Sequence, residues 1–446
     1  MRRSLLYYTR LLVLPLFAVG MVLTGCDSGG SNGGSNGGSN GDDDGSDPST
    51  SQAYPAPSSG NGYAEEIAIN IQSADLGFRL EDSPPQFLKD IYQGNQGSIS
   101  GQEIQVVDAK SPTAPSATTY GGLDEFADIE SQIQDSEFEE TLLRSGDLES
   151  IDTPSSGAKT AHELISYYLY DNTNNGWPKE TTSNGVDMSQ LSEKGVAGAL
   201  TYADAADILN KFRTGSLTSE DKWNEAFGHF GAPRNFRAFL NDDGGLTSGG
   251  SFQDINGDRT TDLVTEGVYI WAGYTAERAA AAQSTGNPNK FSTRAFDGFV
   301  DGRQAIDSGN TGKLTGSDGF AATALQAWEE TVAVNVIHYV NGMQGALGNI
   351  SGEITAQKLD NTSDPDITAA GFQDSWGEAK AFAWALQFND TSDLSDSELE
   401  TIHDLIGNDP PYSENVDAST YSNDLDEVKE DIKNAYGFAD ANVSAW

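Results

Sequence analysis

The sequence contains one cysteine, Cys26, in 446 residues, so no intramolecular disulfide can form. It has only four histidines, which leaves little material for histidine-based catalysis or for multi-imidazole metal sites. Basic residues are few as well, with 25 Lys and Arg against 68 Asp and Glu and a formal charge of −43. A nucleic-acid partner requires a basic surface that displaces counterions from phosphate, so this class of partner is excluded.

Long hydrophobic runs are also absent. The most apolar run, residues 11–23, is 13 residues long, whereas a membrane-spanning helix needs ~20. It follows three arginines within the first ten residues and ends in Leu-Thr-Gly before Cys26. This order predicts a lipoprotein signal peptide over residues 1–25, after which Cys26 is the lipidated first residue. The alternative is an ordinary thiol in a signal peptide that is cut elsewhere.

Residues 26–62 are rich in Gly, Ser, Asn and Asp, and include a repeated Gly-Gly-Ser-Asn unit. Such a segment cannot bury enough apolar surface to offset the chain entropy lost on folding, so it predicts a flexible, disordered tether. A coil of ~35 residues of this kind has a reach of about 30 Å. We therefore expect an exported protein of the cell envelope, attached through its lipid to the outer membrane or the periplasmic face.

Acidic residues are spread along the whole chain rather than clustered. This distribution is typical of salt-adapted, halophilic proteins, because molar salt shortens the Debye length to ~3 Å and screens the repulsion between carboxylates. The alternative is an acidic surface that gathers cations or basic partners.

The remaining chain predicts an all-α fold, a multi-helix antiparallel bundle-like domain over residues 116–446. Apolar residues recur every three to four positions from residue 120 to residue 143, which predicts a helix there. Residues 63–115 instead have short apolar segments split by Pro and Gly, and are expected to form an irregular arm or a few short strands. Ser395 with Glu398, and Thr218 with Asp221, have the spacing of helix-start capping boxes. Further helices are expected at 161–170, 191–212, 219–230, 268–282, 291–306, 320–343, 372–388, 395–406 and 425–436.

The sequence DINGDRTTDL at 254–263 is the clearest metal-binding pattern. Oxygen-bearing side chains at alternate positions suit a hard cation with six to eight oxygen ligands, so the pattern predicts a calcium loop. Glycine stands at the fourth position of the loop instead of the sixth, so the loop departs from an EF-hand. The alternative is a surface loop of Asx turns without an ion. The predicted calcium ligands are Asp254, Asn256, Asp258, Thr260, Asp262 and Glu266.

Two helices carry histidines that could contribute to a pocket. Glu225 and His229 are four residues apart on one predicted helix face, a spacing suited either to two metal ligands or to a surface pair worth a few tenths of a kcal/mol. His338 belongs to a polar stripe on an otherwise apolar helix, and that stripe must be solvated or paired. The alternative for His338 is a hydrogen-bonded interior histidine. His162 begins a helix that lacks the second histidine of a zinc peptidase, and His403 is expected to be solvated because acids flank it.

Several short motifs together resemble an uncharacterised family of bacterial envelope lipoproteins, domain of unknown function 4856, from Tyr120 to the C-terminus. The matching motifs are GVDMSQL at 185–191, EKG at 193–195, WNEAFGHFG at 223–231, AF at 295–296, GRQAI at 302–306, WE at 328–329, IHYVN at 337–341 and LQFN at 386–389 after Glu378 and Phe382. The resemblance implies a secreted, lipid-anchored helical domain without an established activity. Family members often have one histidine before the tryptophan of the WNEAFGHFG motif and another before the glutamate that corresponds to Glu378. This chain has neither histidine. The family is also reminiscent of imelysin-type, iron-linked lipoproteins.

These observations lead to two hypotheses. The first is a non-enzymatic, membrane-anchored lipoprotein that binds a small ligand or a metal, such as iron or zinc, through Glu225, His229, His338 and Glu378, with iron uptake as one role. The second is a structural or adhesive envelope protein in which calcium stabilises the 254–262 loop. No acid/base pair can be singled out among the 68 carboxylates, so we do not expect an enzyme.

Overall fold

The computed structural model describes residues 53–58, 62–80, 83–108, 114–135, 141–148, 151, 157–171, 173–174, 177–178, 181–362, 367–413 and 416–446. The predicted signal peptide, Cys26 and most of the predicted tether lie outside the described residues. Residues 51–446 belong to one structural unit. The predictions of lipidation and of a tether therefore stay predictions.

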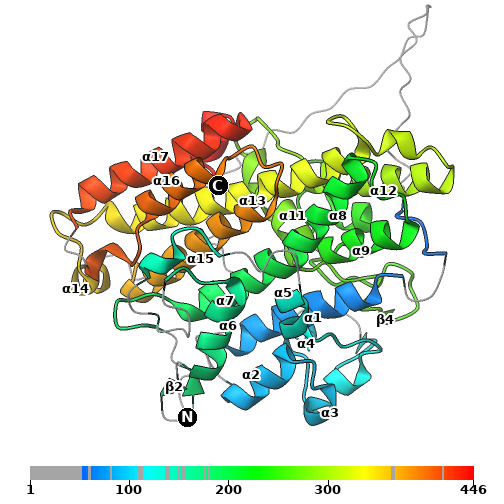
Figure 1. The fold of residues 1–446 in the computed structure, drawn as a ribbon, viewed down its shortest axis with the longest axis horizontal. Coiled ribbons are helices and arrows are strands. Elements are labelled where there is room, and N and C mark those ends of the chain that lie inside the picture. Colours follow the sequence, from blue (N-terminus) through cyan, green and yellow to red (C-terminus); the bar gives the residue numbers. More distant parts are fainter. Residues whose placement is uncertain are drawn as a thin grey trace, which may run out of the picture. The chain divides into compact units, whose positions relative to one another are not determined.

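Helices dominate the described part of the chain, which confirms the prediction of an all-α, multi-helix fold (Figure 1). The first half contains α1 (Ala64–Arg79), α2 (Pro85–Tyr92), α3 (Gln96–Ile99), α4 (Gln105–Asp108), α5 (Ile129–Asp135), α6 (Ala161–Ser166), α7 (Met188–Val196), α8 (Ala203–Arg213), α9 (Glu220–Phe230) and α10 (Phe236–Phe239). The second half contains α11 (Ile270–Gln283), α12 (Phe291–Asp307), α13 (Phe320–Leu347), α14 (Ala356–Asp360), α15 (Ala369–Ala385), α16 (Asp396–Ile406), α17 (Ala418–Tyr436) and α18 (Asp440–Val443).

The described strands are two residues long each. β1 (Ala114–Pro115) pairs in parallel with β4 (Thr260–Thr261), and β2 (Thr173–Asn174) pairs antiparallel with β3 (Trp177–Pro178). The first pair connects residues 114–115 to the predicted calcium loop, because Thr260 and Thr261 are part of that loop. Two π-helical segments, η4 (Tyr167–Asp171) and η5 (Ala197–Tyr202), continue α6 and α7.

α13 is the central helix of the fold. Its 28 residues span about 42 Å, and it packs against α8, α11, α12, α15 and α17 (Figure 1). The ring of Trp328, in the first third of this helix, is fully buried among Phe230, Trp271 and Phe299, with ring centroids 5.1 to 6.4 Å away. Aromatic pairs of this kind add about 0.5–1.5 kcal/mol each to the burial of their area. This aromatic core holds α9, α11 and α12 around α13.

Residues 63–115 differ from the expected irregular arm, since they contain α1 to α4. The alternation of Ile67, Ile69 and Ile71 has the period of a strand. In α1 these residues are all buried, as are Asn70 and Gln72 between and after them, because α1 is covered by α2, α4, α7 and α9. A helix that is buried nearly all round has no polar face, and so gives no helical periodicity in its sequence.

The helix expected over 120–143 is also wrong in extent, since only α5 forms within its described residues. Gln72 of α1 explains the interruption. Its buried amide accepts the N–H of Ala127 at 2.7 Å and donates to the carbonyl oxygen of Ala127 at 2.8 Å. Both backbone groups of Ala127 are thereby satisfied outside a helix.

Of the two capping boxes predicted at helix starts, one is confirmed and the other is wrong. Ser395 and Glu398 form the predicted box at the start of α16. At α9 the N-cap is Ser219, one residue after the predicted Thr218, and its side chain makes no capping hydrogen bond. A further box, Thr160 with Glu163, begins α6 and accounts for the glutamate that follows His162.

The segment 53–58 lies against α9. The Tyr54 ring is fully buried and stacks on Phe227, with centroids 3.7 Å apart and an interplanar angle of 4°. Its hydroxyl donates to Oδ1 of Asn224 at 2.7 Å. Its backbone N–H donates to the carbonyl oxygen of Arg234 at 2.8 Å. Tyr54 thus fixes the described segment 53–58 to the helical domain.

None of the helices in the described ranges combines the length and the apolar character needed to cross a bilayer.

Candidate functional site

The structure places the four residues predicted for one pocket in three separate surroundings. Glu225 and His229 lie on α9, whereas His338 lies on α13 and Glu378 on α15. His229 faces a carboxylate on α8, while Glu378 faces a lysine on α7. These residues therefore form three groups, which are described separately.

The first group is part of a set of four side chains from three helices, which we name the acidic cluster: Glu66, Asp204, Glu225 and His229. His229 is 3% exposed, and its Nε2 lies 3.9 Å from Oδ2 of Asp204. Its Nδ1 is buried and has no hydrogen-bond partner. Burial, and then the charge of Lys222, lower the pKa of His229 to about 3, so the imidazole is neutral at pH 7.

The carboxyl groups of the acidic cluster lie where negative charge is disfavoured. Burial raises the pKa of Asp204 to about 7, and repulsion from Glu225 and Asp207 adds to this shift. Burial also raises the pKa of Glu66 to about 8, again with Glu225 as a contributor. Near neutral pH these two groups therefore hold protons that a bound cation would release.

Close packing of α1 against α9 brings Glu66 to this place. Gly228 directly precedes His229, and a Cβ at Gly228 would lie only 2.7 Å from the Cβ of Glu66. One turn after Glu66, the Asn70 side chain donates Nδ2–H to the carbonyl oxygen of Gly228 at 3.0 Å. A glycine in α9 and an amide in α1 therefore set the approach of the two helices.

Asp204 lies in the first turn of α8, directly after the π-helical segment η5. The carbonyl oxygen of Ala197 in η5 accepts from Oγ1–H of Thr201 at 2.7 Å and from Nε1–H of Trp271 at 3.3 Å. π-helical turns inside α-helices are frequent at functional sites. α7, η5 and α8 form one continuous helical run. Within this run, η5 lies where the packing partner changes from α15, which contacts α7, to α9, which contacts α8.

No three His, Cys, Asp or Glu side chains among the described residues are arranged to hold a metal ion directly. In the acidic cluster, Glu225 is paired with Lys222, with 2.6 Å between Oε2 and Nζ. Imidazole and carboxylate groups suit first-row transition metals. The cluster therefore offers suitable ligand types, and Glu225 would have to leave Lys222 to join them around an ion.

The second group surrounds Lys194 of α7, which is 5% exposed. Its Nζ lies 2.7 Å from Oε1 of Glu193 and 3.5 Å from Oε1 of Glu378. Burial raises the pKa of Glu378 to about 7, against the effect of Lys194. Burial also disfavours the Lys194 charge, but Glu193, Tyr274 and Glu378 outweigh it and raise the pKa of Lys194 above its usual range. This group is a buried ion-pair network that connects α7 to α15.

His338 lies in a polar stripe of α13 that is paired with protein groups. Asn335 accepts Nε–H of Arg278 through Oδ1 at 2.9 Å, and Asn341 donates to a carbonyl oxygen of α18 at 2.8 Å. Burial, and then the charge of Arg278, lower the pKa of His338 to about 3. A hydrogen bond with the backbone of Trp446 acts in the opposite direction and raises this pKa by a smaller amount. The predicted stripe thus joins α11 and the C-terminal segment to α13.

The predicted calcium loop is held by its own polar side chains. Asp254 accepts the backbone N–H of Gly257 at 2.7 Å and of Arg259 at 2.8 Å. Glu266 is 4% exposed and accepts from the backbone of Ile255, two residues into the loop, at 3.0 Å. Three of the remaining predicted ligands accept as follows: Asn256 from Asp258 N–H at 2.8 Å, Asp258 from Thr260 N–H at 2.8 Å, and Asp262 from Thr265 N–H at 2.8 Å. The fourth, Thr260, lies in β4 opposite Ala114.

Arg259 occupies the sixth position of this loop and has a left-handed backbone, with φ of 75°. Calcium loops of the EF-hand type need glycine at the sixth position because the chain turns sharply there. The backbone therefore turns at the sixth position, where the sequence has an arginine, and it has a positive φ of 78° at Gly257 as well. Sequence reasoning counted the misplaced glycine as a departure and could not detect the turn.

His403 was expected to be solvated, and this prediction is wrong, because its side chain is fully buried. It packs against Trp384 with ring centroids 5.6 Å apart, and neither ring nitrogen has a hydrogen-bond partner. Burial, and then Lys380 and Arg144, lower the pKa of His403 well below its usual value. The acids beside it in sequence lie on the outer face of α16, where Glu400 pairs with Arg144 at 3.2 Å.

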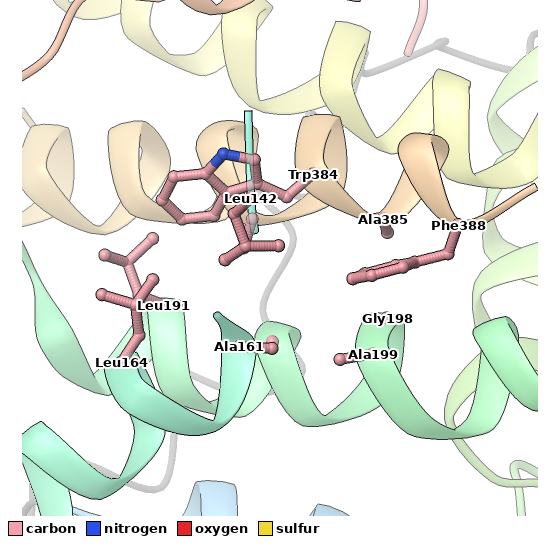
Figure 2. Close-up of a pocket in the computed structure, with 11 residues that line it drawn as sticks. Leu142, Ala161, Leu164, Leu191, Gly198, Ala199, Trp384, Ala385 and Phe388 are labelled. Atoms are coloured by element: carbon pink, nitrogen blue, oxygen red, sulfur yellow. The ribbon is translucent and has the colours of Figure 1, made fainter. Parts of the chain in front are cut away.

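An apolar pocket lies between η5 and α15 (Figure 2). Trp384 and Phe388 close it from one side and Leu164 and Leu191 from the other, and its volume is about 10 Å³. That is about the space of one water molecule, and no polar side chain is present to orient a ligand. We interpret it as a packing gap near Gly198, where a Cβ would lie 2.8 Å from the Cβ of Ala385.

Comparison with models of protein families, with curated proteins and with solved structures gives no match. The resemblance to domain of unknown function 4856 therefore stays a prediction.

Proposed function

We propose that this protein is an exported, lipid-anchored binding protein of the cell envelope, and that its helical domain binds a divalent transition-metal ion at the acidic cluster. It is a carrier or store for the ion rather than an enzyme. The Leu-Thr-Gly-Cys26 signal supports export and anchoring. The observation that carries the binding proposal is His229, a buried neutral imidazole whose Nδ1 lacks a partner and whose Nε2 faces Asp204.

A buried polar group without a partner costs about 1–3 kcal/mol, so His229 is retained at a cost to stability. Metal binding would offset this cost, because neutral imidazole is a preferred ligand of zinc and iron. Asp204 faces the imidazole, and Glu225 interacts with both Asp204 and Glu66, so these carboxyl groups supply the charge that balances a divalent ion. Binding would release the protons held by Asp204 and Glu66 and would separate Glu225 from Lys222.

The test is titration calorimetry of the full-length protein with zinc chloride, and with ferrous sulfate without oxygen, in two buffers of different ionisation enthalpy. We expect about one ion per chain and proton release on binding. His229→Ala and Asp204→Asn should weaken the affinity at least about tenfold. His162→Ala is the matched control, because His162 is hydrogen-bonded to Tyr92 and lies on another helix. Equal affinity in His229→Ala, or no heat from either metal, would exclude the cluster as the site.

The second candidate function is a structural envelope protein stabilised by calcium at the 254–262 loop. The left-handed turn at Arg259 and the inward acceptors Asp254 and Glu266 favour it. We expect calcium to raise the melting temperature relative to a chelator, and Asp258→Ala to abolish the difference. Asp242→Ala, which removes an exposed acid in another turn, is the control. No calcium-dependent shift in the unmodified protein would remove this candidate.

A further inference from the structure

A polar pocket of about 400 Å³ lies between segments that are far apart in the sequence. The connection from α11 to α12 provides Asn287 and Asn289, while α12 provides Arg294 and α13 provides Glu330. The turn from α17 to α18 provides Phe438 on the other side. The volume is in the range of about 300–1,000 Å³ that small-molecule sites have, whereas the apolar pocket holds about one water molecule. Its residues are separate from the acidic cluster, so it does not depend on the metal proposal.

The charged groups of this pocket neutralise each other. Arg294 and Glu330 form a bidentate pair, with 2.5 Å between Nη1 and Oε2 and 3.1 Å between Nη2 and Oε1. Glu330 is 6% exposed, so the negative charge of its carboxylate is compensated by Arg294 rather than by water. A charged ligand would have to compete with an ion pair whose carboxylate is buried, although the Arg294 side chain is 36% exposed. The pocket is therefore suited to a neutral ligand.

The other groups supply paired donors and acceptors beside the exposed part of one aromatic ring. The amides of Asn287 and Asn289 can each donate and accept, as neighbouring hydroxyl groups of one ligand require. The Phe438 ring is fixed, because it stacks on Tyr436 at 5.5 Å and 14° and meets Trp446 edge-on at 5.0 Å. Only 8% of Phe438 is exposed, so a C–H group of a sugar or a polyol would contact this small part of it.

The walls are held in place before any ligand binds. Asn442 of α18 donates Nδ2–H to the carbonyl oxygen of Asn287 at 2.9 Å, which joins the two sides of the pocket. Asn289 accepts from Arg294 through Oδ1 at 3.5 Å. A preformed pocket binds with a smaller loss of conformational entropy.

We propose that this pocket binds a neutral, hydroxyl-rich small molecule, a mono- or disaccharide or a related polyol. Arg294 and the two asparagines hydrogen-bond its hydroxyl groups, and Phe438 contacts one of its C–H groups. An anionic ligand is disfavoured by the paired Arg294 and by the acidity of the whole chain.

The test is saturation-transfer difference NMR on the full-length protein with glucose, galactose, N-acetylglucosamine and trehalose. We expect transfer from at least one of these sugars, with binding weakened at least about tenfold in Asn289→Ala and in Ala439→Trp, which fills the pocket from its rim. Neither residue is buried, so both variants should fold, and near-ultraviolet circular dichroism checks this. Asn361→Ala, at the exposed end of α14, is the matched control and should bind normally. Absence of transfer from all four sugars, or transfer unchanged in both pocket variants, would overturn the proposal.

Discussion

Lys194 and Glu378 lie 3.5 Å apart in the interior, on facing turns of α7 and α15, and Glu193 completes the group at 2.7 Å. Removal of one partner from a buried ion pair leaves an uncompensated charge, at a cost of about 3–5 kcal/mol. Lys194→Met should therefore lower the free energy of unfolding by this amount at pH 7. Glu378→Gln should cost less, because the carboxyl group has a pKa of about 7 and is partly protonated already.

Urea denaturation of both variants measures these differences. Lys211→Met is a suitable control, because Lys211 pairs with Asp207 at the surface, with its side chain 41% exposed. Exposed pairs contribute about 0–1 kcal/mol. A Lys194→Met variant no less stable than Lys211→Met would mean that the buried network does not join α7 to α15.

Stability should depend on pH through the acidic cluster. The pKa of Asp204 is about 7 in the folded protein and about 4 when unfolded, so the folded state binds the extra proton between these values. The stability that Asp204 provides is present at low pH and is lost as pH rises through 7. The free energy of unfolding of Asp204→Asn, relative to that of the wild type, should therefore increase by on the order of 1–3 kcal/mol as the pH rises from 5 to 8.5.

His229 has the opposite dependence. Its pKa is about 3 when folded and about 6.5 when unfolded, so the unfolded state binds more protons between these values. Its contribution is present above pH 6.5 and is lost as pH falls. His229→Gln should therefore be relatively more stable at pH 4.5 than at pH 7.5. Thermal melts of Asp204→Asn and His229→Gln, with Asp207→Asn as control, would show opposite slopes, and parallel slopes would contradict the assignment.

Glu329 of α13 receives hydrogen bonds from two segments that follow it in the chain, the loop before α16 and the end of α17. Its Oε1 accepts from the Tyr436 hydroxyl at 2.7 Å and from Ser392 at 2.8 Å, and Asn389 donates to Oε2. A double-mutant cycle of Glu329→Gln and Tyr436→Phe should give a coupling energy of about 1.5–3 kcal/mol. Tyr421 on the same helix donates to the carbonyl oxygen of Ile406 instead, so Tyr421→Phe should show no coupling with Glu329→Gln. Equal coupling for both tyrosines would mean that Tyr436 has no special role.

Two glycines should respond to alanine in opposite directions. Gly302 of α12 lies against the fully buried ring of Trp223, which a Cβ would overlap. Gly302→Ala should destabilise the protein by about 1–3 kcal/mol. Gly345 of α13 has nothing within 4 Å of its added Cβ, so Gly345→Ala should stabilise the helix by about 0.5–1 kcal/mol. Both effects can be measured by thermal unfolding.

The sequence predicts helices well where one face is polar and poorly where it is not. α9, α12 and α16 appear within about a residue of their expected bounds. α1 was missed because it is covered on nearly every side, and its polar Asn70 and Gln72 are as buried as its isoleucines. Periodicity measures exposure, so it cannot find a helix without an exposed face.

The acidic cluster could be predicted only in part. The spacing of Glu225 and His229 on one helix face is visible in the sequence. Asp204 and Glu66 come from helices 21 and 159 positions before Glu225, and no local pattern connects them. Their meeting depends on Gly228, whose missing side chain lets α1 approach α9. A glycine inside a strong amphipathic helix was the available signal for such an approach.

The stacking of Tyr54 on Phe227 determines where the folded domain would carry a mechanical load. Any pull transmitted from the residues before position 53 would reach the helices through this ring, through the hydroxyl bond to Asn224 and through the backbone bond to Arg234. The first two contacts are on α9, the helix that also carries Glu225 and His229. Under tension the acidic cluster would thus be among the first places to be strained.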